Sequence, residues 1–173
     1  LLGMVIEAAT ETPLAEAYRM HIYEPLGMSS TFLDCYEEPV MDVVHGYTSS
    51  GDAMADVTDL HESVGWSAGG LVSTAADLTA FARGLFGGAL FDNPETLEAM
   101  TTAVPGSSYG LGVMLQGEYM GHAGYIAGFR SVLNYAPETD TVVVLLYNHD
   151  GADPEQNLAD VMNPALPLLQ AAE

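Results

Sequence analysis

Residues 119–134 have the sequence Tyr-Met-Gly-His-Ala-Gly-Tyr-Ile-Ala-Gly-Phe-Arg-Ser-Val-Leu-Asn. Two apolar runs typical of strands, 109–115 and 141–148, flank this stretch. Its three glycines are too closely spaced for an ordinary strand interior; glycine there marks a bulge, a turn or a close approach to the backbone. His122 lies between the first two. The local pattern leaves two interpretations: a surface histidine in a glycine-rich hairpin, or a strand edge whose imidazole faces a substrate.

The charge balance of the chain excludes several classes of function. The 173 residues include 24 acidic and only 3 basic residues, none of them lysine, and the net charge is −21. Such a surface repels nucleic acid and anionic membranes. The absence of lysine also excludes a P-loop or a Schiff-base mechanism supplied by this chain.

The excess of acidic residues accompanies a normal hydrophobic fraction of 49%, which favours a folded protein. At molar salt the Debye length falls to about 3 Å, so the self-repulsion of this surface would be largely screened. We therefore expect a protein adapted to a high-salt environment. The alternative is an acidic protein from ordinary salt.

Cys35 is the only cysteine, which rules out an internal disulfide. The five histidines have no metal-ligand spacing, so we expect no metal and no cofactor; a metal-binding acidic protein is a weaker alternative. No apolar run reaches the roughly 18 residues of a membrane span. Residues 1–6 have no basic region typical of a signal peptide, and we expect the chain to be a fragment of a longer protein.

Helical periods and caps dominate the first part of the chain, and strands with short turns dominate the second. His21 falls on the buried stripe predicted for the second helix, Ser73 and Thr74 are expected to cap a helix, and the run 142–146 is apolar enough for a central strand. Residues 29–65 have no strong period, and long segments of this kind often form the walls of a site. The expected helices span 1–10, 13–23, 74–87, 93–100 and 154–162, and the expected strands span 43–47, 109–115, 118–122, 129–135 and 141–147. The pattern predicts an α+β fold in which helices pack on an antiparallel sheet.

Several short motifs follow one another in a fixed order along the chain. They are Leu2-Gly3, Glu24-Pro-Leu-Gly-Met28, Ala68-Gly-Gly-Leu-Val-Ser-Thr-Ala-Ala-Asp77, Tyr109-Gly-Leu-Gly112, and Gly121-His-Ala-Gly124 with Gly128-Phe129. Together they resemble the C-terminal half of the serine β-lactamase and penicillin-binding-protein-like family, which includes class C β-lactamases, D-alanyl-D-alanine carboxypeptidases and related carboxylesterases. The resemblance implies the β-lactamase/transpeptidase-like fold, with residues 1–173 as a single partial domain that lacks the N-terminal part.

Members of this family use a Ser-x-x-Lys motif, a Tyr-x-Asn motif and a Lys-Thr-Gly or His-x-Gly motif. This chain matches only the third. The resemblance implies that His122 is catalytic and that Ala123, Gly124 and Tyr125 bind the substrate, with the Tyr125 amide donating to the reacting carbonyl oxygen. Gly124 would let the substrate lie against the strand. Arg130 is a further candidate for contacting a substrate carboxylate; its alternative is an outward strand charge paired with nearby acids.

The resemblance therefore implies one part of a serine hydrolase that works through an acyl-enzyme. We expect an esterase or peptidase acting on a small or peptide-like acyl substrate, rather than a true β-lactamase. The isolated chain should be inert, and without its N-terminal half it should expose apolar surface and self-associate. The resemblance also implies the cell envelope or secretion. The alternative function is a non-catalytic binding or scaffold domain that has kept the fold.

Overall fold

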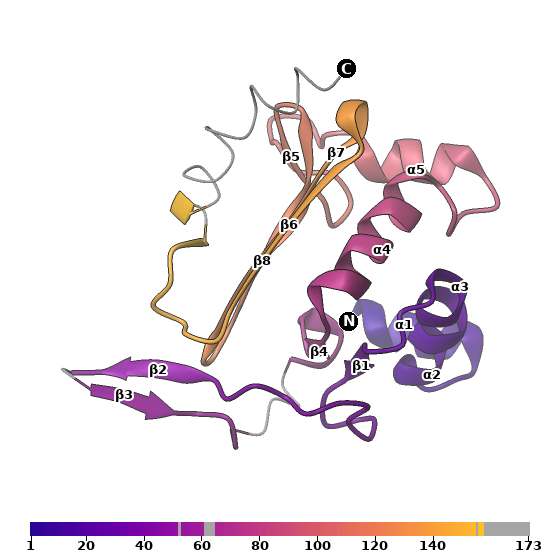
Figure 1. The fold of residues 1–173 in the computed structure, drawn as a ribbon. Helices are drawn as coiled ribbons and strands as arrows, with labels where there is room; N and C mark the ends of the chain where they lie inside the picture. Colours follow the sequence, from indigo (N-terminus) through magenta and orange to yellow (C-terminus); the bar gives the residue numbers. More distant parts are fainter. Residues whose placement is uncertain (52, 61–64, 155, 158–173) are drawn as a thin grey trace.

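The computed structural model describes residues 1–51, 53–60, 65–154 and 156–157, and it has the expected α+β architecture. Its centre is an antiparallel sheet in the order β5-β6-β7-β8 (Figure 1). Consecutive strands pair because short turns join them. The sheet strands are β5 (Met114–Gln116), β6 (Tyr119–Ile126), β7 (Phe129–Ala136) and β8 (Thr141–Tyr147).

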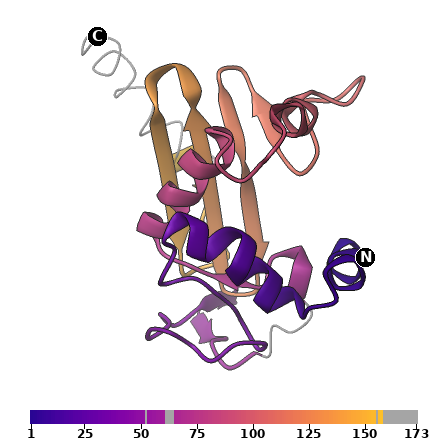
Figure 2. The same cartoon turned by 90° about the vertical axis from the view of Figure 1, so that its right-hand side faces the viewer.

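The helices α1–α5 gather on one face of this sheet, while residues 151–154 lie on the other (Figures 1 and 2). The helix α4 packs on β7 and β8, and its Phe86 ring stacks on Tyr135 with ring centroids 5.4 Å apart. Thr74 caps α4 as expected, accepting a hydrogen bond from the Asp77 amide at 3.2 Å. The helices are α1 (Leu2–Thr10), α2 (Leu14–Tyr18), a π-helix (Arg19–Tyr23), α3 (Glu24–Leu26), α4 (Ala75–Phe86) and α5 (Pro94–Thr101).

Two small sheets complete the described fold. In one, β1 (Phe32–Leu33) pairs with β4 (Leu71–Val72); in the other, β2 (Tyr47–Ser50) and β3 (Ala53–Asp56) form a hairpin. The hairpin contacts the β6–β7 turn, since the Tyr47 amide donates to the Gly128 carbonyl at 3.4 Å. The segment without a strong period thus contains strands of its own.

A buried polar cluster joins the segment before β1 to α4. The Asp77 carboxylate accepts from the Ser30 amide at 2.8 Å and from the Thr31 hydroxyl at 2.7 Å, and the Thr31 and Ser73 hydroxyls lie 2.8 Å apart. Thr31 is 1% exposed and Asp77 8%. We call Ser30, Thr31, Ser73 and Asp77 the Asp77 clamp; it fixes α4, and through α4 the sheet, against the first helices.

The structure corrects four predictions of secondary structure. The helix predicted over 13–23 widens into a π-helix after Tyr18, which turns His21 to the exposed surface. The strand predicted over 43–47 is wrong, because the first hairpin strand begins at Tyr47.

The other two corrections concern the main sheet. Residues 109–113 form a loop before β5 rather than the start of a strand, with one bridge from Tyr109 to Met114. The strand β8 is not central: it pairs only with β7 and is the last strand of the sheet among the described residues. The helix predicted over 154–162 lies largely outside the described residues. None of the described helices has the length and apolar character needed to cross a bilayer.

Candidate active site

The strand β6 has an open edge beside His122. β5 pairs only with Tyr119–Gly121, whereas β7 pairs with β6 along residues 120–126. Residues 122–126 therefore have a strand neighbour on one side only within the described residues. The backbone groups that point away from β7 remain available to another extended chain or to a ligand.

The register of the β6–β7 hairpin shows which amides these are. Ala127 and Gly128 form the turn, with Gly128 at φ +79°, and Ile126 pairs with Phe129 across it. A turn of this kind is closed by a hydrogen bond, and hydrogen-bonded pairs alternate along an antiparallel ladder. Tyr125 is therefore a non-hydrogen-bonded partner of β7, and its N–H points to the open edge. This is the orientation that a donor to a substrate carbonyl needs.

The His122 imidazole is exposed and is held by two contacts. Its Nδ1 lies 2.5 Å from the Ala123 carbonyl oxygen, and its Nε2 lies 2.6 Å from the Tyr109 hydroxyl. The Tyr109 and His122 rings meet edge to face, with centroids 5.7 Å apart and an angle of 80° between their planes. Because side chains alternate along a strand, the His122 side chain lies on the same sheet face as position 124, two residues further along β6, and on the face opposite to the Tyr125 side chain.

The loop that presents Tyr109 explains the Tyr109-Gly-Leu-Gly112 motif. A Cβ at Gly110 would clash with the Met100 carbonyl, and Gly112 has φ +79°. Both positions therefore require glycine. Backbone hydrogen bonds fix the loop around the tyrosine: Val104 donates to the Tyr109 carbonyl at 2.9 Å, and Gly110 donates to Val113 at 2.8 Å.

Glycine at the His-x-Gly motif also has a reason inside the sheet. A Cβ at Gly124 would meet the Ser131 hydroxyl on β7, a side-chain atom that can rotate away. At Gly121 a Cβ would instead meet the Leu133 carbonyl, which is backbone and cannot. The space at Gly124 can thus be altered at low structural cost, while Gly121 is fixed by the pairing of β6 with β7.

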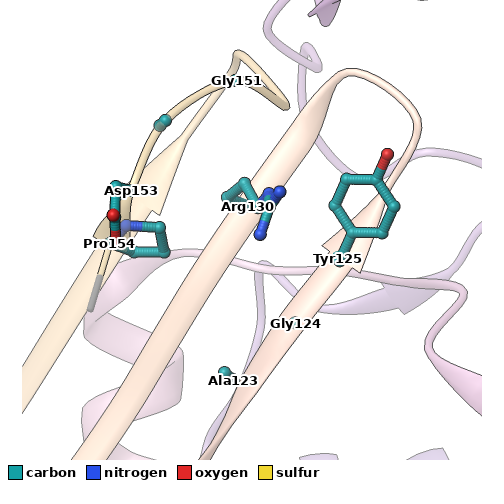
Figure 3. A pocket seen from close by; sticks show the side chains of 8 residues that line it. Ala123, Gly124, Tyr125, Arg130, Gly151, Asp153 and Pro154 are labelled. Atoms are coloured by element: carbon teal, nitrogen blue, oxygen red, sulfur yellow. The ribbon is translucent and has the colours of Figure 1, made fainter. Parts of the chain in front are cut away.

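A hollow of about 440 Å³ lies over β6 and β7 (Figure 3). Ala123, Gly124, Tyr125 and Arg130 line it from the strands, and residues 151–154 line it from the following segment. The Arg130 guanidinium stacks on the Tyr125 ring, 4.3 Å from its centroid, and its Nε donates to the Asp150 carbonyl at 2.8 Å. Arg130 therefore braces the hairpin on the far face from His122.

One of the two interpretations of Arg130 is wrong, because no carboxylate among the described residues forms an ion pair with it. A contact between Arg130 and a substrate carboxylate stays a prediction; Arg130 lines the same hollow as Gly124 and Tyr125. The other two arginines do form such pairs, Arg19 with Glu37 and Arg83 with Asp140.

Charge and metal chemistry contribute little near the open edge. Burial raises the pKa of Tyr119 on β6, and the pKa of Asp150 is lowered mainly by a hydrogen bond from the Thr48 side chain and also by one from the Gly128 amide. Within the described part of the chain, no cluster of three or more histidine, cysteine or acidic side chains could hold a metal ion. The candidate site therefore consists of backbone donors, one imidazole and one phenol.

A family model described as Beta-lactamase matches residues 1–165. The chain belongs to the β-lactamase family. Among curated proteins it is 28% identical over 151 residues to the putative penicillin-binding protein PbpX of Bacillus subtilis (strain 168), covering 86% of this chain and 38% of that protein.

Two solved structures agree with this assignment to the β-lactamase family. A D-stereospecific amidohydrolase from Streptomyces sp. superposes with a TM-score of 0.79 at 28% identity, covering 91% of this chain and 50% of that one. The D-amino acid amidase from Ochrobactrum anthropi SV3, complexed with L-phenylalanine amide, has a TM-score of 0.72 at 30% identity, covering 85% and 47%. The chain therefore spans half or less of the length of these relatives.

For this member of the β-lactamase family, the structure places the four predicted site residues, His122 to Tyr125, consecutively on β6, and their roles stay predictions. The sequence did not predict Tyr109, which was assigned to a strand. The signal was present in the Tyr109-Gly-Leu-Gly112 motif, because two glycines that close a loop fix the side chain before them.

Proposed function

We propose that this chain forms the substrate-carbonyl side of a serine hydrolase that works through an acyl-enzyme. The observation that carries the proposal is the open β6 edge, where the Tyr125 amide points outward next to His122. The nucleophile would come from outside this chain, because a Ser-x-x-Lys pair needs a lysine and the chain has none.

In this reaction a serine oxygen attacks the substrate carbonyl carbon and the oxygen of that carbonyl gains negative charge. The Tyr125 N–H donates to this oxygen, and such a donor is worth about 3 kcal/mol of transition-state stabilisation. The bond to the leaving group then breaks, and the leaving group takes the proton that the serine hydroxyl gave up. Water later attacks the ester of the acyl-enzyme and restores the serine. His122 acts together with its hydrogen-bonded partner Tyr109, either by orienting the substrate or by assisting one of these proton transfers.

The proposed substrate is an amide or ester with a small or peptide-like acyl group. Two relatives are named as an amidohydrolase and an amidase, and a third as a putative penicillin-binding protein. These names favour an open-chain acyl compound, with a β-lactam as a related inhibitor. Esterase activity remains part of the proposal, because ester and amide carbonyls develop the same oxyanion.

Exposed apolar side chains on α1 and β8 support the proposal that another part of the protein packs on these two elements. In α1, Leu2 is 76% exposed, Met4 60% and Val5 54%. In β8, Leu146 is 47% exposed and the outer edge of the strand carries no partner among the described residues. We propose that an N-terminal half covers these surfaces, and that the chain alone is inert and self-associates through them.

Covalent labelling tests the proposal. This chain alone and the same chain joined to an upstream Ser-x-x-Lys half are treated with a fluorophosphonate and with a fluorescent penicillin. Label should appear only in the joined protein, and His122→Ala should slow it more than the control His21→Ala, which alters an exposed histidine far from the open edge in sequence. A joined protein that takes no label from either probe would favour the alternative, a non-catalytic binding or scaffold domain.

The environment is a separate proposal. The surface charge of −21 supports a high-salt setting, and the family supports the cell envelope or secretion. Screening of carboxylate repulsion should raise the unfolding temperature steadily from 0.1 M to about 2 M KCl. An unfolding temperature that is independent of salt would argue for an acidic protein of ordinary salt.

A further inference from the structure

We infer that Tyr109 is a positioning residue for His122, which it holds in a single orientation and a single tautomer. The inference rests on the proposed function, because it assigns a part to the same site. It starts from the two contacts of the imidazole, 2.5 Å from Nδ1 to the Ala123 carbonyl and 2.6 Å from Nε2 to the Tyr109 hydroxyl.

The chemistry of the two partners assigns the proton of the neutral ring. A carbonyl oxygen can only accept a hydrogen bond, so Nδ1 must carry the proton that it shares with Ala123. Nε2 then has only its lone pair, so the Tyr109 hydroxyl must be the donor. Rotating the ring by half a turn would place carbon atoms at both partners and lose both hydrogen bonds. A neutral His122 ring has two tautomers in each of two orientations, and the hydrogen bonds to Ala123 and Tyr109 select one of these four states.

The Tyr109 hydroxyl is suited to this role because its backbone is fixed. The Ser107 hydroxyl donates to the Tyr109 carbonyl at 3.2 Å, and the Tyr109 amide donates back to that hydroxyl oxygen at 3.3 Å. Leu111 donates to the Met100 carbonyl at 2.9 Å and ties the loop to the end of α5. A residue that only filled space would not need its oxygen aimed at a ring nitrogen.

The fixed tautomer determines what His122 offers to a bound substrate. Its Nδ1–H is already used by β6 itself, and its Nε2 lone pair is occupied by Tyr109. The hydroxyl oxygen of Tyr109 keeps its own lone pairs, and Tyr109 as a residue is 37% exposed. Tyr109 and His122 thus act as one hydrogen-bonding unit at the open edge.

Nitrogen NMR of the full 173-residue chain tests the tautomer without any need for activity. Two-bond ¹H–¹⁵N spectra of the neutral ring should show His122 protonated at Nδ1 only. Tyr109→Phe keeps the aromatic ring and removes the hydroxyl, and a second tautomer should then appear. The control Tyr119→Phe removes a hydroxyl from the same strand as His122 and should leave the His122 signals unchanged. A wild-type ring protonated at Nε2, or a single unchanged tautomer in Tyr109→Phe, would overturn the inference.

Acylation of the joined protein separates this inference from the proposed function. Tyr109→Phe should slow acylation about tenfold, the effect of one lost hydrogen bond in the transition state, with KM nearly unchanged. In a His122→Ala background it should have no further effect. If His122→Ala slows acylation and Tyr109→Phe does not, the positioning role is wrong. If His122→Ala itself has no effect, the proposed function fails whatever the tautomer.

Discussion

The Asp77 clamp and the open β6 edge use similar polar groups in opposite ways. In the clamp, the Asp77 carboxylate receives two hydrogen bonds from buried or partly buried donors, and Thr31 is 1% exposed. At the edge, His122 is exposed and Tyr125 is 67% exposed, and the Tyr125 amide faces outward. Polar groups in the clamp are satisfied by the chain. At the edge the chain holds the His122 ring through Ala123 and Tyr109, but the Tyr125 amide is left for something else.

The difference separates stability from function within one domain. A buried carboxylate with all of its partners inside the chain makes unfolding costly, because losing one partner leaves the others unsatisfied. An open strand edge adds little stability and is a hazard for aggregation unless it is used. Substitutions in the clamp should therefore change stability, and those at the edge should change chemistry.

The largest effect is expected from Asp77→Ala in the clamp. The substitution removes the acceptor of the partly buried Ser30 amide and leaves the buried Thr31 hydroxyl with Ser73 alone, so the free energy of unfolding should fall by about 3–4 kcal/mol. Urea unfolding measures this, with Asp92→Ala as a control at an exposed acidic residue. A loss below about 1 kcal/mol for Asp77→Ala would mean that the clamp does not hold α4.

Gly110→Ala should change both the stability of the protein and the geometry of the open β6 edge. Its Cβ would clash with the backbone carbonyl of Met100, so the loop must shift, at a cost of about 2 kcal/mol of stability. The shift should also separate Tyr109 from His122, which the His122 nitrogen signals would report. Ser108→Ala, in the same loop, is the control. A stable Gly110→Ala variant with unchanged His122 signals would show that the glycine does not position Tyr109.

Gly124→Ala should affect chemistry more than stability. The new methyl group meets only the Ser131 hydroxyl, which can rotate, so the free energy of unfolding should change by less than about 1 kcal/mol. In the joined protein the same methyl group narrows the edge beside His122, and acylation should slow at least tenfold. The double variant Gly124→Ala/Ser131→Ala removes the internal contact. If it restores the rate fully, the defect came from the sheet and not from the substrate side.

The smallest effect on stability is expected from an exposed ion pair, His45 and Asp56, which belongs to neither the Asp77 clamp nor the open β6 edge. His45 Nδ1 lies 2.7 Å from the Asp56 carboxylate on the β2–β3 hairpin, and hydrogen bonding to Asp56 raises the pKa of His45. A raised histidine pKa means that the pair contributes stability below the unfolded pKa of about 6.5 and loses it as pH rises through the folded value.

Hydrogen bonds to Asp56, first from the Thr58 hydroxyl and amide, lower its pKa to about 2. This contribution is present above pH 4 and is lost as pH falls toward 2. A proton NMR titration of His45 measures the first shift, and Asp56→Asn should return the midpoint toward 6.5. If His45 has the same titration midpoint in the wild type and in Asp56→Asn, the two side chains do not interact. Molar salt should reduce the shift of the His45 midpoint in the wild type.

The sequence predicted most of the fold because its signals are local. The cap at Thr74 and the strands predicted over 129–135 and 141–147 were correct. It failed where neighbours in space decide: the apolar run in β8 indicated a central strand, but hydropathy alone cannot tell burial by this chain from burial by another part of a longer protein. The π-helix that exposes His21 has no local signal either.

The sequence likewise predicted one part of the candidate site and missed another. The motif at 122–125 located the β6 edge, because glycine spacing and a histidine are readable in one strand. Tyr109 was missed, since its contact with His122 depends on a loop closing from 13 residues away. The brace formed by Arg130 and Tyr125 was also missed, because the alternation that puts them opposite to His122 requires the strand register.

Hydrogen exchange at the Tyr125 amide tests the central claim most directly. The rate is measured by NMR in the joined protein, first free and then as the stable adduct with a fluorophosphonate or a penicillin. The account predicts fast exchange in the free protein, because the N–H points to an open edge, and a reduction of at least tenfold in the adduct. An amide already protected in the free protein, or one whose exchange is unchanged by the adduct, would contradict it.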